Sequence, residues 1–126
     1  RDDNELIAVL AHEVGHVVHR HALRRVLQDS TVVLVIAAVT GDVTSITSLA
    51  AAIPVVLVEA KYSRDFEREA DDYALSYLSA NDISPRHFAD ILLRMEQSAP
   101  ATSEVPGYLS THPAAEERVQ RFREHG

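Results

Sequence analysis

The sequence contains no cysteine, no long hydrophobic run and no block of like charges, and each absence excludes a class of protein. Without cysteine, disulfides are impossible, and a zinc site would need histidine and carboxylate ligands. The two apolar runs within 31–58 are each shorter than the roughly 20 residues that cross a bilayer. The net charge of −7 includes no charged tail, and nucleic acid is not an expected partner because phosphate binding needs a clustered basic face.

The composition is that of an ordinary folded protein. A hydrophobic fraction of 46% and a charged fraction of 25% over 126 residues predict a single domain, spanning 1–126, with one core. The chain opens with Arg1, and no signal peptide is visible. We therefore expect a processed chain or a fragment of a longer precursor, and oligomeric state is left open.

Apolar residues recur mostly at helical spacing, which predicts a mainly α-helical chain. The pattern predicts four helices outside 31–58 and a Pro-, Ser- and Gly-rich loop over 98–110. Ser63 is the expected cap of the second helix, Asn81 its expected stop, and Pro113 the expected first residue of the last. The four helices are expected at about 4–28, 64–80, 85–97 and 113–124.

Residues 31–58 have two interpretations. Two apolar runs separated by GDVTSITS fit a buried helical hairpin, because short apolar runs usually enter a core. The same segment also fits an apolar flap that contacts a membrane surface. Its content of β-branched residues keeps strands open for part of it.

The stretch AHEVGH places His12, Glu13 and His16 in the first predicted helix. Residues four apart share one helix face, so both imidazoles can direct a nitrogen at one ion about 2.0–2.1 Å away. Glu13 then lies beside the first ligand, where its carboxylate can exchange a proton with an attacking water. The alternative is three polar residues on a solvated face.

A catalytic zinc site needs a third protein ligand. In the predicted helix over 64–80, Glu67 and Asp71 are four residues apart within FEREAD. One could bind the ion and the other could hydrogen-bond a ligating histidine. The alternative is a solvated face rich in ion pairs. Glu69 is turned about 200° from Glu67 at 100° per residue, and we do not expect it to share the site.

Three blocks in order, AVLAHEVGHVVHRHA, YSRDFEREADDYAL and LSTHPAAEERVQRF, resemble the zinc metallopeptidases that include HtpX, the mitochondrial Oma proteases and the CAAX prenyl proteases. The resemblance implies a zincin-like catalytic domain, which is α+β when complete, with an active-site helix and a glutamate helix. It also implies one Zn²⁺ per chain, Glu67 as third ligand and Asp71 as support for a ligand.

The same resemblance places His112 near the metal, where it stabilises the oxyanion or occupies the open position. Capping of the last helix is the competing interpretation of His112. Arg118 is implied as a substrate or structural anchor, against the alternative of a solvated arginine. We leave four further histidines out of the site: His19, His21, His87 and His125.

The resemblance also leads us to expect that a part of the family's catalytic domain is missing from this chain. In the family a β-hairpin whose edge strand binds the substrate backbone precedes the active-site helix, and here only eleven residues precede His12. We expect a zinc endopeptidase with a protein or peptide substrate, acting in membrane-associated or cell-envelope quality control. The alternatives are a zinc-stabilised helical module that binds or chaperones without hydrolysis, and a helical bundle without metal.

Overall fold

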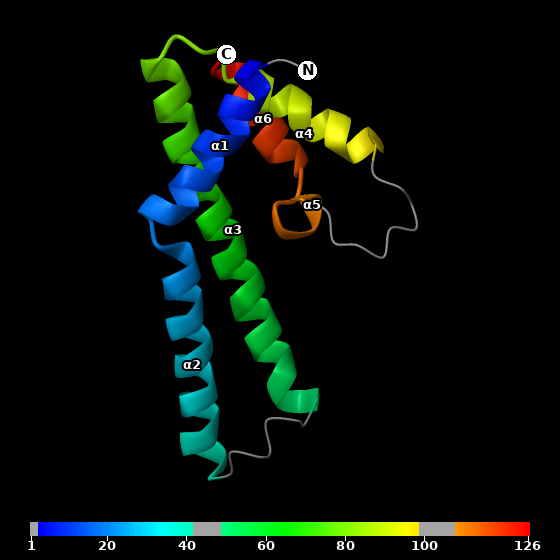
Figure 1. The fold of residues 1–126 in the computed structure, drawn as a ribbon. Helices are drawn as coiled ribbons and strands as arrows, with labels where there is room; N and C mark the ends of the chain where they lie inside the picture. The colour runs from blue at the N-terminus through cyan, green and yellow to red at the C-terminus, as the bar shows by residue number, and fades with distance from the viewer. Residues whose placement is uncertain (1–2, 42–48, 99–107) are drawn as a thin grey trace. The chain divides into compact units, whose positions relative to one another are not determined.

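The computed structural model describes residues 3–41, 49–98 and 108–126; for 36, 39, 40, 49–62 and 110 it describes the backbone alone. The described residues form helices and connecting turns without a strand, which confirms the mainly α prediction. The helices, drawn in Figure 1, are α1 (Asp3–Val18), α2 (His21–Thr40), α3 (Leu49–Ala80), α4 (Arg86–Ser98), α5 (Tyr108–Thr111) and α6 (Glu116–Glu124).

The chain divides into two compact units. The first unit comprises Arg1–Gly15 and Ala70–Gly126, and the second comprises His16–Glu69. Helices α1 and α3 each contribute residues to both. Whether the chain behaves as one domain stays a prediction.

The first unit holds a hydrophobic core made by four helices. Phe88, Leu92 and Phe122 are among the largest apolar side chains in it, and they have no exposed surface. The rings of Phe88 on α4 and Phe122 on α6 lie 4.6 Å apart, and Figure 1 shows these two helices packed side by side. The remaining core residues are Ala8, Ala11, Ala74, Leu75, Leu78, Ala89 and Val119.

Small residues let α1 and α3 approach closely within the first unit. A Cβ added to Gly15 would lie 2.9 Å from both the Cα and the carbonyl oxygen of Ala70. The buried residues Ala8 and Ala11 of α1 and Ala74 of α3 also have small side chains. Glu5 is also buried at the start of α1, where Arg94 of α4 forms two hydrogen bonds to its carboxylate.

The helix predicted over 4–28 is wrong, because α1 ends at Val18 and α2 begins at His21. Arg20 adopts a left-handed conformation (φ 53°, ψ 39°), which redirects the chain. This conformation is costly for a residue other than glycine, and the sequence carries no glycine or proline that announces it. The break changes the face on which His21 lies.

The two apolar runs of 31–58 lie within helices that extend beyond the segment at both ends. Helix α2 continues to Thr40 and ends at Gly41 (φ 70°), whereas α3 already begins at Leu49, well before the predicted cap at Ser63. Leu34 and Val35 are exposed, so this part of α2 is not buried. The connection over 42–48 lies outside the described residues. None of the described helices combines the length and apolar character that crossing a bilayer requires.

The C-terminal half follows the prediction more closely. Helix α3 ends at Ala80, and the left-handed residue that stops it is Asp82 (φ 55°) rather than Asn81. Helix α4 occupies the predicted range within one residue, although Pro85 precedes it. The last helix begins at Glu116, three residues later than predicted, because Pro113 and Ala114 are not helical and Ala115 is extended (φ −65°, ψ 139°). A loop was predicted where α5 forms its single turn.

We expect Gly15→Ala to destabilise the protein by about 1–3 kcal/mol, because the new Cβ meets the backbone of Ala70. Alanine favours helices over glycine by about 1 kcal/mol, so the clash must exceed that gain for the sign to hold. Thermal unfolding followed by circular dichroism measures the change. Val14→Ala on the exposed side of α1 is the matched control and should stay within about 0.5 kcal/mol of wild type. A Gly15→Ala variant as stable as this control would contradict the close approach.

Candidate metal centre

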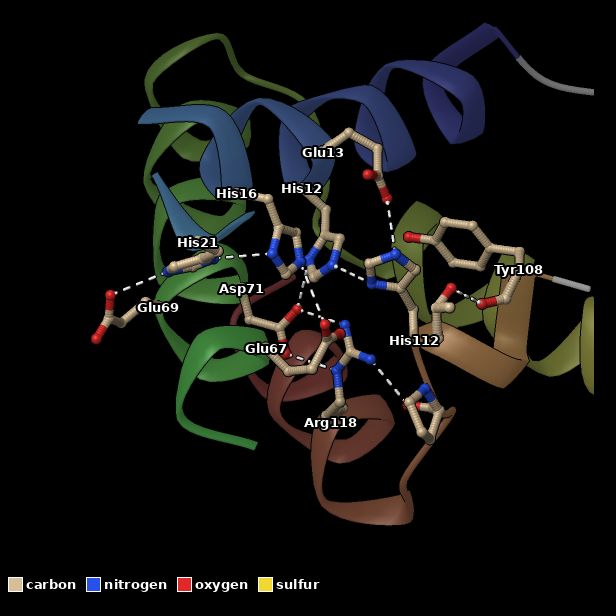
Figure 2. A network of polar contacts seen from close by, with 12 residues as sticks. His12, Glu13, His16, His21, Glu67, Glu69, Asp71, Tyr108, His112 and Arg118 are labelled. Atoms are coloured by element: carbon tan, nitrogen blue, oxygen red, sulfur yellow. Dashed lines mark hydrogen bonds and ion pairs between the residues drawn. The ribbon is translucent and has the colours of Figure 1, made fainter. Parts of the chain in front are cut away.

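His12 lies fully buried in the first unit, with both ring nitrogens directed at polar partners (Figure 2). Its Nδ1 is 2.9 Å from Oδ1 of Asp71 on α3, and its Nε2 is 3.4 Å from Nδ1 of His112. The ring stacks on Phe88 with centroids 5.3 Å apart. A carboxylate on one nitrogen fixes the ring and leaves the other for a ligand.

Asp71 is itself held by Arg118 of α6. The guanidinium donates two hydrogen bonds to the carboxylate, from Nε to Oδ2 and from Nη2 to Oδ1, each 2.7 Å long. Its Nη1 donates to the carbonyl oxygen of Pro113 at 2.8 Å. Only 11% of the Arg118 side chain is exposed, so the residue forms a structural anchor and not a solvated charge.

His112 follows α5 and does not cap α6, whose first residues are preceded by Ala115. Its ring stacks on Tyr108 with centroids 4.7 Å apart. Its Nε2 lies 3.7 Å from Oε1 of Glu13. The first unit therefore brings together five of the predicted site residues: His12, Glu13, Asp71, His112 and Arg118.

The other two predicted site residues meet in the second unit. Nε2 of His16 is 3.2 Å from Oε1 of Glu67, and the Glu67 side chain is buried. Nδ1 of His16 is 2.8 Å from Nδ1 of His21. The solvated-face interpretation of this charged stretch fits the exposed Asp72 and the partly exposed Asp65, which flank FEREAD. It does not fit the buried Glu67 and Asp71.

His21 and Glu69 are the residues that sequence reasoning missed. His21 is buried against Phe66, with ring centroids 4.5 Å apart, and its Nε2 lies 3.1 Å from Oε2 of Glu69. On an unbroken helix His21 would lie about 140° around from His16 at 100° per residue. The turn at Arg20 brings the two rings together, and no local sequence signal predicts it.

Charges around Glu69 keep this carboxylate ionised. Two hydrogen bonds from Arg24 are the main cause that lowers the pKa of Glu69 to about 2. Arg24 also lies over the ring of Phe66, 4.7 Å from its centroid. Burial lowers the pKa of His21, which favours a neutral ring.

The distances within each unit fit a tetrahedral metal ion. Donors placed 2.0–2.1 Å from such an ion lie about 3.3–3.4 Å apart. His16 Nε2 and Glu67 Oε1 are 3.2 Å apart in the second unit, and His12 Nε2 and His112 Nδ1 are 3.4 Å apart in the first. Imidazole and carboxylate are also the donors that zinc accepts in a chain without thiolates. The residues present therefore suit the ion.

Comparison with known proteins gives the class. Residues 1–125 match the peptidase family M48, and the chain belongs to that family. It is 32% identical to metalloprotease LoiP and 30% identical to metalloprotease YcaL, both of Escherichia coli K12, over 97% and 98% of this chain and 49% of each relative.

A putative β-barrel assembly-enhancing protease of Vibrio cholerae is 26% identical over 98% of this chain and 28% of its own length. The chain thus spans about half the length of LoiP and YcaL, and less of the Vibrio protein. No solved structure matches significantly. The metallopeptidase family suggested by the three sequence blocks is confirmed, and such a family implies a divalent metal.

Arg118→Ala should destabilise the protein by about 3–5 kcal/mol, because it leaves the buried Asp71 carboxylate without its two charged donors. Arg121, one turn along α6 from Arg118, pairs with the exposed Asp72, and Arg121→Ala should cost at most about 1 kcal/mol. Urea unfolding of both variants measures the difference. Equal losses in the two would contradict the special role of the buried pair.

Arg24→Met should raise the pKa of Glu69 from about 2 towards its ordinary value of 4.5 while keeping an apolar stem over Phe66. Because the folded-state pKa of Glu69 is the lower one, its ion pair stabilises the fold above about pH 4.5, and this contribution disappears as pH falls towards 2. NMR titration of the Glu69 carboxyl carbon reports the pKa. Arg25→Met, at an exposed neighbour, should leave it near 2.

Proposed function

We propose that this chain carries the active site of a zinc-dependent endopeptidase, with His12, His16 and Glu67 as the metal ligands. One observation carries the proposal: in each unit an HExxH histidine presents Nε2 to another metal-binding donor at 3.2–3.4 Å and holds Nδ1 against a partner. His12 and His16 lie one turn apart on the continuous helix α1. The membership of a peptidase family supports the same assignment.

The protein residues divide the work of hydrolysis. A bound zinc ion supplies Lewis acidity, which makes water nucleophilic near neutral pH. Glu13 is next to His12 on α1, and its carboxylate is suited to take a proton from water and return it to the leaving amine. Asp71 and Arg118 keep the His12 ring oriented, so that no reorganisation is needed when the ion binds.

His112 has two roles open to it. Its Nδ1 is 3.4 Å from Nε2 of His12, which is the spacing of two ligands on one tetrahedral ion, and in this state it would occupy the position that substrate needs. Rotated away, the ring could donate a hydrogen bond to the developing oxyanion. Stacking on Tyr108 and the approach of Glu13 to Nε2 support the first role in the present conformation.

Substrate and location are proposed from the relatives. A protein or peptide substrate follows from the peptidase family. The name of the Vibrio relative links that relative to the assembly of β-barrel proteins. We place this chain in membrane-associated quality control in the cell envelope. The exposed apolar side chains of α2, among them Leu34 and Val35, support contact of the 31–58 segment with a membrane surface.

A second candidate is a zinc-stabilised module that binds unfolded segments without cleaving them. The observation in its favour is an apolar groove of about 200 Å³ in the first unit. Six side chains of α1 and α3 line it: Ile7, Leu10, Ala11, Val14, Tyr73 and Tyr77. Such a groove suits an extended apolar peptide and needs no reacting group.

Two substitutions separate these functions. Glu13→Gln should retain one zinc ion per chain and lower the rate of cleavage of an unfolded protein by at least about 100-fold, because the variant lacks the general base. Glu67→Ala should lose both zinc and cleavage. Elemental analysis measures the metal, and gel assays with casein measure the cleavage.

Each possible result tests one residue role or separates the two candidate functions. Stoichiometric zinc in Glu67→Ala would refute Glu67 as a ligand. Zinc with undiminished cleavage in Glu13→Gln would refute the general base, and zinc without cleavage in the wild-type chain would favour the binding module. Asp65→Ala, at an exposed carboxylate of the same helix, controls for nonspecific loss of charge and should retain both metal and activity.

A further inference from the structure

The contact between His16 and His21 assigns a proton to each ring of the second unit. At 2.8 Å, one Nδ1 must donate and the other must accept, since two lone pairs or two N–H groups would repel. Distances alone do not decide the direction. The direction follows from the contact that the other nitrogen of His21 makes with Glu69.

Glu69 settles that direction. Its carboxylate accepts two hydrogen bonds from the Arg24 guanidinium and acts as an acceptor, so the His21 nitrogen 3.1 Å from it, Nε2, must carry the proton. A neutral His21 then has its lone pair on Nδ1. His16 must therefore donate from its own Nδ1. Its Nε2 faces Oε1 of Glu67 at 3.2 Å, where it can bind an ion that lies between them or, without an ion, carry a proton directed at that carboxylate.

We propose that His21, held by Glu69, is a positioning residue that fixes the tautomer and ring orientation of His16, so that Nε2 of His16 is available to a metal ion. The proposal rests on the proposed role of His16 as a zinc ligand. Asp71 supports His12 directly. Glu69 would support His16 in the same way, but through the neutral imidazole of His21, which lies between them.

Packing supports the assignment. The His21 ring is 4% exposed, lies nearly parallel to Phe66 (15°) and meets His16 edge-on (79°), which is the orientation that points Nδ1 at the neighbouring ring. Arg24 holds the Glu69 carboxylate from another direction. A ring confined on these sides has little freedom to turn, so its hydrogen bonds are preorganised.

Binding of a second metal ion is a competing role for His21 and Glu69, and the charges around them disfavour it. His19, His21 and Glu69 could together hold a second metal ion. Arg24, however, places a guanidinium on the carboxylate that such an ion would need, and Nδ1 of His21 is engaged by His16. We therefore assign His21 and Glu69 to support of His16, and a second ion becomes an outcome of the test.

Three substitutions test the proposal in the full chain. His21→Phe preserves the ring stacked on Phe66 but removes both nitrogens, and it should weaken zinc binding by about 10–100-fold in chelator competition. His21→Asn restores an acceptor, the amide oxygen, at the δ position and should recover most of that loss. His19→Phe, which alters a neighbour of Glu69 that is also stacked on His21, is the matched control and should bind zinc as wild type does.

A second measurement does not depend on zinc. Long-range ¹H–¹⁵N correlation spectra of the metal-free protein should show a proton on Nδ1 of His16 and, for His21, a proton on Nε2 alone. In His21→Phe the proton on Nδ1 of His16 should no longer be fixed. Circular dichroism and thermal unfolding confirm that each variant is folded.

Several results would overturn the proposal. These are a wild-type His16 without a proton on Nδ1, a folded His21→Phe that binds zinc as tightly as wild type, and a His21→Asn no better than His21→Phe. Two zinc ions per wild-type chain, falling to one in His19→Phe, would show a metal site instead. If wild type binds no zinc but has the expected tautomers, the proposed function fails while the hydrogen-bond assignment stands.

Discussion

The close contact between α1 and α3 in the first unit is the constraint on which the rest of the structure depends. Gly15 lies against the backbone of Ala70, at a distance that no larger residue permits. Gly15 directly precedes His16, and Ala70 directly precedes Asp71. The glycine inside the HExxH motif is therefore as much a packing residue as a spacer. It allows the part of α1 that carries His12 to lie directly on the part of α3 that carries Asp71.

Much of the site could be predicted because it depends on helix periodicity alone. Spacing of four places His12 and His16 on one face of α1, and the same spacing relates Glu67 to Asp71 on α3. These relations survive errors in helix boundaries, and α3 carries its carboxylates as predicted although it begins well before Ser63. The roles of Asp71 and Arg118 needed the family resemblance, since charge patterns alone also fit a solvated face.

What sequence reasoning missed depends on single backbone angles. The left-handed conformation at Arg20 ends α1 and turns His21 back towards His16, and nothing in HRHALRR requires it. Similarly, the extended conformation of Ala115 delays α6 until Glu116, so His112 does not cap that helix. Such conformations are stabilised by tertiary contacts, here the buried ring of His21 and the bond from Arg118 to the Pro113 carbonyl, which local propensity does not register.

Arg118 has a mechanical consequence. One guanidinium bonds both Asp71, which faces His12, and the carbonyl of Pro113, the residue after His112. The rigid, planar guanidinium of Arg118 thus helps to orient the His12 ring and also holds the backbone next to His112. Thermal displacement of α6 would move the His12 ring and the backbone at His112 together. Such correlated motion would change the separation of the two histidines less than independent motions would. The position of His112 then varies mainly through its own side-chain torsions, which makes its approach to His12 a local, fast event and not a rearrangement of helices.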